Sequence, residues 1–91
     1  MKLKVTVRLF HELRATVGQS ELELEADTLN DVVKSLISKQ GSLKELFFNS
    51  KGDLRGHILF YVNNKVQNPL DLNMKLHNGD LVLLIPPAAG G

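Results

Sequence analysis

Residues 21–37 read ELELEADTLNDVVKSLI, and within this stretch the spacing of the apolar residues changes. At first apolar and acidic residues alternate, which is the period of a half-buried strand. From Leu29 onward the apolar residues recur at the i, i+3, i+4, i+7, i+8 spacing of one helical face. Thr28 is placed to cap this helix, Asp31 stands where the acid of a capping box belongs, and Gly41 is expected to end it. The stretch therefore predicts a strand followed directly by a helix.

The same alternation occurs upstream, between Lys2 and Phe10, where apolar residues alternate with Lys, Thr and Arg. We predict a strand there, joined to the next strand as a hairpin through a short connection that is broken at Gly18. Paired in this way, the basic row of the first strand faces the acidic row of the second. Opposite charges across a sheet contribute about 0.2–1 kcal/mol per pair. We therefore interpret the glutamates as a solvated face of the sheet and not as a carboxylate site.

Downstream of the helix, two more strands are expected, at Ile58 to Val62 and at Leu81 to Ile85. Asn63-Asn64 predicts a tight turn into a short return strand, and residues 42–56 are interpreted as a loop with one turn of helix. This order of elements, with the last strand adjacent to the first, is typical of a β-grasp fold. That fold is an α+β domain with a mixed sheet of four to five strands and one main helix packed on one face.

The two later strands are apolar at every position, although one helix can cover only one side of a sheet. If the residues between them point at the helix, four others lie on the open face: Leu59, Tyr61, Leu83 and Ile85. Either the loop at 42–56 covers these residues, or they form an exposed apolar patch, which is the usual mark of a protein-protein site.

Composition limits the class of protein. The 91-residue chain is 43% hydrophobic and 23% charged, as in ordinary globular domains, and is long enough for one small core. Its net charge of +1 provides no field that would gather nucleic acid or anionic lipid. Apolar runs stay far below the roughly 20 residues needed to span a bilayer. We therefore expect a cytoplasmic protein with neither a nucleic-acid nor a membrane partner.

The carboxyl end of the chain carries the clearest functional signal. Pro86 and Pro87 follow the last apolar strand, and the chain ends in Gly90 and Gly91. The prolines fix φ near −65° and favour an extended stem, while glycines without a Cβ can enter a narrow channel and leave the carboxylate open to attack. We expect a domain over residues 1–85 and a flexible reactive tail over residues 86–91. The alternative is an inert, frayed end on a plain interaction domain.

Ordinary catalytic patterns are missing from the sequence. The chain has no cysteine, and its three histidines are isolated, so we expect no metal site and no bound cofactor. No serine stands in a nucleophile elbow, and no glycine-rich loop joins a strand to a helix. The chain is expected to be non-catalytic on its own.

Several motifs, taken together, resemble the small subunit of molybdopterin synthase and its ubiquitin-like sulfur-carrier relatives. They are Leu9-Phe10-His11-Glu12-Leu13-Arg14 with Gly18, Val62-Asn63, Gly79-Asp80, Pro86-Pro87 and the terminal Gly90-Gly91. Departures include His11, Ala15, Ala88 and a longer middle around residues 42–56. The longer middle keeps the archaeal small-modifier branch of the family open as an alternative.

The resemblance implies a mechanism. A partner adenylating enzyme would use ATP and Mg²⁺ to activate the Gly91 carboxylate, and a sulfur donor would convert it to a thiocarboxylate for molybdenum or tungsten cofactor biosynthesis. Gly91 would be the reacting residue and Gly90 a slim neck. Pro86 and Pro87, with the open-face apolar residues, would dock on the molybdopterin synthase large subunit.

Two other uses of the same activated terminus remain open. In one, a lysine of a target protein captures the Gly91 adenylate, and the chain is a ubiquitin-like protein modifier. In the other, the chain donates sulfur for tRNA thiolation or thiamin. Thiamin sulfur carriers are usually shorter and lack the Pro-Pro stem, so that reading ranks last.

Overall fold

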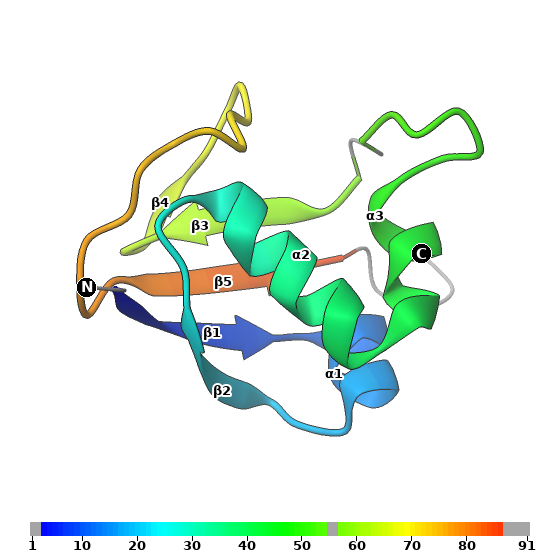
Figure 1. Ribbon diagram of the computed structural model, residues 1–91, viewed down its shortest axis with the longest axis horizontal. Helices are drawn as coiled ribbons and strands as arrows, with labels where there is room; N and C mark the ends of the chain where they lie inside the picture. The colour runs from blue at the N-terminus through cyan, green and yellow to red at the C-terminus, as the bar shows by residue number, and fades with distance from the viewer. Residues whose placement is uncertain (1–2, 55–56, 87–91) are drawn as a thin grey trace.

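The computed structural model describes residues 3–54 and 57–86. It contains one five-stranded sheet in the order β2-β1-β5-β3-β4, in which β1 and β5 are parallel and the other pairs antiparallel. The strands are β1 Lys4–Leu9, β2 Glu21–Glu25, β3 Leu59–Val62, β4 Lys65–Val66 and β5 Leu81–Ile85. The helices are α1 His11–Val17, α2 Leu29–Lys39, the 3-10 turn η1 Gly41–Leu43 and α3 Lys44–Phe47. Helix α2 crosses one face of the sheet (Figure 1), so the predicted two-layer α+β architecture is confirmed.

Strands β1 and β2 pair as their alternating patterns predicted. Lys4 lies opposite Glu25 and Arg8 opposite Glu21, and Arg8 Nε donates to Glu21 Oε1 at 2.8 Å. The expected short hairpin connection is wrong, because helix α1 lies between the two strands. Gly18 ends that helix in the left-handed conformation, with φ 85°, and its N–H donates to the carbonyl oxygen of Arg14.

Helix α2 begins where the capping signal placed it. The Thr28 hydroxyl accepts from the Asp31 N–H, and Asp31 Oδ2 accepts from the N–H groups of Asp27 and Thr28. This capping box satisfies amide groups that have no partner within the helix. The helix ends at Lys39, two residues before Gly41, which starts η1.

The core lies between α2 and the sheet. Its central residues are Val7, Leu9, Phe60, Val82 and Leu84 from the strands with Leu29, Val32, Val33 and Leu36 from α2, all at most 1% exposed. Segment 41–47 closes one end through Leu43 and Phe47, and the Phe47 ring lies 6.2 Å from the Phe60 ring between centroids. Within residues 3–54 and 57–86, no helix is long and apolar enough to cross a membrane.

Candidate functional site

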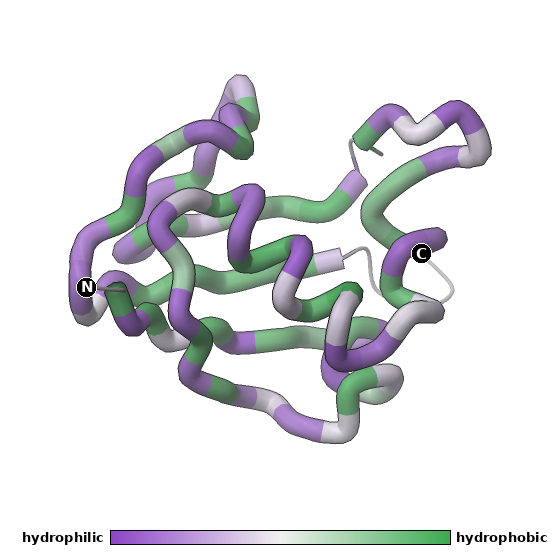
Figure 2. Tube along the Cα trace, in the orientation of Figure 1, coloured by the Kyte–Doolittle hydropathy of each residue, from purple (hydrophilic) through white to green (hydrophobic). Residues whose placement is uncertain are grey.

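The face of the sheet opposite α2 carries a strip of apolar side chains over β3 and β5. Tyr61 lies opposite Leu83, and Leu59 lies opposite Ile85, so the four side chains share one face. We call these four residues the open-face patch. Leu59 is 47% exposed and the other three are half-buried, whereas the intervening residues of both strands are buried under α2. The hydropathy of β5 is uniformly high along its length (Figure 2). Binding by this patch stays a prediction.

The described part of segment 42–56 places its most buried apolar side chains in the core. Leu43 and Phe47 of this segment are fully buried, and Phe47 contacts Phe60, which points to the α2 side of the sheet. The segment therefore packs on the helix side of β3. Leu46 and Phe48 also pack against the core, and this use of the segment's apolar side chains favours the alternative of an exposed patch.

The structure adds a residue that sequence reasoning missed. Val66 of β4 lies opposite Tyr61, so it extends the same apolar face to the edge of the sheet, and it is 47% exposed. The signal was present in the turn: a two-residue Asn63-Asn64 loop with positive φ at both residues fixes which β4 residue opposes Tyr61.

The carboxyl end of β5 marks where the tail begins. Because β1 and β5 are parallel and Leu9 lies opposite Leu84, the carboxyl ends of both strands lie at the same end of the sheet. The start of α1 and the end of β5 are therefore close together. Pro86, expected to begin a flexible tail, is buried, so the packed domain extends at least one residue beyond the predicted boundary at residue 85. Pro87, Gly90 and Gly91 lie outside the described residues.

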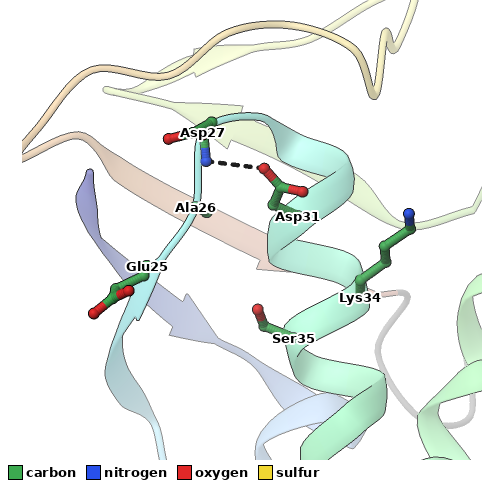
Figure 3. A pocket seen from close by; sticks show the side chains of 6 residues that line it. All are labelled: Glu25, Ala26, Asp27, Asp31, Lys34 and Ser35. Atoms are coloured by element: carbon green, nitrogen blue, oxygen red, sulfur yellow. Dashed lines mark hydrogen bonds between the residues drawn. The ribbon is translucent and has the colours of Figure 1, made fainter. Parts of the chain in front are cut away.

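A surface pocket of about 290 Å³ lies between the end of β2 and α2 (Figure 3). Its acidic residue Asp31 is already engaged in the capping box. Hydrogen bonding from the Asp27 N–H lowers the pKa of Asp31; burial opposes this shift, and bonds from Thr28 add to it. Asp31 thus serves the helix end. Across residues 3–54 and 57–86, no three His, Cys, Asp or Glu side chains are grouped to hold a metal ion.

Comparison with known proteins places these features in a family. The ThiS family model matches residues 7–91. A protein of Archaeoglobus fulgidus named for a sulfur-carrier role is 30% identical over 82 residues, covering 87% of this chain and 93% of the relative. Small archaeal modifier protein 3 of Haloferax volcanii is 29% identical over 93 residues, covering 98% of this chain and 100% of that protein.

Solved structures share the fold across nearly the whole chain. Small archaeal modifier protein 1 of Methanosarcina acetivorans has a TM-score of 0.84 at 32% identity, covering 100% of this chain and 99% of its own. A chain of the BexX/CysO complex of Amycolatopsis orientalis has a TM-score of 0.78 at 25% identity, covering 96% and 99%. A chain of the Helicobacter pylori complex of molybdopterin-converting factor subunits 1 and 2 shares the fold, with a TM-score of 0.64 at 24% identity and coverages of 98% and 100%.

Proposed function

The chain belongs to the ThiS family, and we propose that it carries sulfur as a thiocarboxylate on Gly91 and delivers it to a molybdopterin synthase large subunit. The observation that carries the proposal is the continuity of three features. The family match extends to the last residue, the last residues are Gly90 and Gly91, and the strand that leads to them carries half of the open-face patch.

The chemistry follows from the terminus. A free carboxylate is a poor electrophile, so an adenylating enzyme first joins the Gly91 carboxylate to the AMP part of ATP and releases pyrophosphate. Hydrosulfide supplied by a sulfur donor then attacks the acyl carbon; the new C–S bond replaces the bond to the phosphate, AMP leaves, and the product is a thiocarboxylate. Since the chain contains no cysteine, it has no thiol of its own that could hold the sulfur. The two terminal glycines offer the acyl carbon with minimal steric hindrance.

Docking is assigned in this proposal to the open-face patch. Half-buried apolar residues with Leu59 exposed at 47% form the kind of surface that a partner protein buries at the centre of an interface. A relative of similar fold is known in a complex, that of BexX and CysO. The adenylating enzyme and the large subunit would use this face in turn, because each must receive the same terminus.

Intact mass of the protein purified from its own cells tests the carrier state. We expect a fraction of molecules heavier by the exchange of one oxygen for sulfur, located by fragmentation at Gly91. Deletion of Gly91 should abolish the exchange and leave thermal unfolding unchanged, while the control Ala88→Gly keeps the terminal pair and should retain it. Sulfur acquired equally by the deletion variant would refute the proposal.

A second candidate, protein modification, is favoured by the relatives named as small archaeal modifier proteins, at 29% and 32% identity. Here a target lysine attacks the Gly91 adenylate and forms an isopeptide bond. Lys75 is the last residue at which trypsin cleaves, so the remnant on the target would run from Leu76 to Gly91. Finding this branched peptide, and losing it in cells without the adenylating enzyme, would shift the assignment from carrier to modifier.

A further inference from the structure

The register of β5 is not specified by its own apolar pattern. All five residues of this strand, LVLLI, are apolar, and its neighbour β3 reads LFYV. A slip of one residue would exchange the two faces of β5 yet still place an apolar side chain at each buried position. A burial pattern opposes a one-residue slip most strongly where the slip would bring polar side chains into the core, and β5 has no polar side chain. The register of β5 therefore calls for a feature outside this apolar pattern.

Asn63 and Asp80 form that feature, and we call the pair the register bracket. The Asn63 N–H donates to the Leu81 carbonyl oxygen at 2.8 Å, and the Leu81 N–H donates to Asn63 Oδ1 at 3.0 Å. Asn63 Nδ2 donates to Asp80 Oδ1 at 2.9 Å. The turn after β3 thus holds the first residue of β5 through both of that residue's backbone groups. These three bonds are possible together in only one register.

Asp80 is itself held from two further directions. Its Oδ2 accepts from the His77 N–H at 2.8 Å, and its carbonyl oxygen accepts from the Thr6 N–H of β1 at 2.9 Å. Its side chain is 12% exposed. Burial acts to raise the pKa of Asp80, but hydrogen bonds from Asn63 and His77, together with the His77 charge, outweigh it and leave the pKa lowered. The carboxylate is therefore charged at neutral pH and is a strong acceptor for Asn63.

We propose that Asn63 and Asp80 are positioning residues that set the register of β5 and, through it, the reach of the Gly91 terminus beyond the open-face patch. The part concerning reach rests on the proposed function. Each residue of slip would move the start of the tail by about 3.3 Å along the strand. A displacement of about 1 Å at a reacting centre can lower the rate by about 100-fold, so register matters for activation.

A matched pair of variants tests the register directly. Asn63→Gly removes both side-chain bonds of the bracket, and Asn64→Gly changes the adjacent residue, whose φ is also positive but which does not belong to the bracket. Glycine accepts positive φ without strain, so backbone conformation is controlled. Across the β3–β5 pair, we expect NMR to show Leu83 paired with Tyr61 alone in Asn64→Gly, and paired also with residues beside Tyr61 in Asn63→Gly. One identical set of contacts in both variants would overturn the proposal.

Tail length tests the functional consequence. One glycine inserted before Gly90 lengthens the tail by roughly 3.3–3.6 Å. With the adenylating enzyme and ATP, we expect this insertion to lower pyrophosphate exchange by about 100-fold in the parent protein. In Asn63→Gly the same insertion should lower pyrophosphate exchange by about tenfold or less, because β5 then samples more than one register. If the inserted glycine lowers pyrophosphate exchange equally in Asn63→Gly and Asn64→Gly, the bracket does not set the reach of the terminus. If no protein supports exchange, the proposed function fails while the NMR contacts still decide the register.

Discussion

The two halves of the sheet, β1 with β2 and β3 with β5, differ in the contacts that fix their strand register. In β1 and β2 apolar residues alternate with polar, mostly charged ones, and Arg8 bonds to Glu21 across the strands. In β3 and β5 both faces are apolar, and the register bracket of Asn63 and Asp80 provides the polar contacts at one end. The first half keeps a solvated face. In the second half the open-face patch occupies the same face, and the polar contacts lie at the turn after β3.

This difference explains why binding is assigned to the second half only. A sheet face that carries charged side chains stays hydrated. A continuous apolar face is stabilised when a partner covers it, because burying apolar surface lowers the free energy. The parallel pairing of β1 with β5 joins the halves, because it places polar Arg8 directly beside Leu83. The boundary between the polar and the apolar part of this face therefore runs between the two adjacent strands β1 and β5.

The largest effect is expected in the core of the second half. Phe60→Ala should lower the free energy of unfolding by about 3–5 kcal/mol, since it removes a 1% exposed ring that contacts Phe47. Urea denaturation followed by circular dichroism measures this change. Leu22→Ala, in the half-buried position of β2, should cost clearly less. Equal losses would show that both halves contribute alike to the core.

Binding should respond to the open-face patch more than stability does. Leu83→Asp places a charge at the centre of the patch and should weaken binding to the partner by about 2 kcal/mol or more, roughly 30-fold in Kd. Calorimetric titration measures the affinity, and unfolding in urea shows whether the fold is kept. Ser20→Asp, exposed just before β2, adds the same charge to the other half and should leave Kd unchanged. Similar losses in both variants would point to net charge as the cause.

Acid should weaken the register bracket. The folded pKa of Asp80 is lowered, so the stability it contributes is present above the unfolded value of 3.8 and is lost as pH falls through the folded pKa. Asp80→Asn should cost roughly 1.5 kcal/mol at pH 7, the low end for a bond to a charged group. It should also flatten the decline of stability below about pH 4. An unchanged acid slope in Asp80→Asn would mean that other carboxylates, such as Asp31, account for the decline.

Sequence reasoning recovered the elements with long or capped patterns and missed those held by tertiary contacts. The four longer strands and the shared face of the open-face residues followed from the apolar patterns, whereas the capping box of α2 followed from Thr28 and Asp31. Helix α1 was missed because Leu13 is its only buried residue, so seven residues show no helical period. The bracket was visible only as two short motifs, Val62-Asn63 and Gly79-Asp80. Asn63 and Asp80 are 17 residues apart in the sequence, and only the folded sheet brings their side chains into contact.

The smallest effect is expected for the charge pair of the first half. Arg8 and Glu21 side chains are each 53% exposed, so solvent screens their attraction. A double-mutant cycle with Arg8→Ala and Glu21→Ala should give a coupling of about 0.2–1 kcal/mol that falls further in high salt. The same cycle on Asn63 and Asp80 should give a larger coupling that changes little with salt, because Asp80 is mostly buried and Asn63 is neutral. A stronger, salt-resistant coupling at Arg8 and Glu21 would reverse the comparison and make surface charge the better determinant of register.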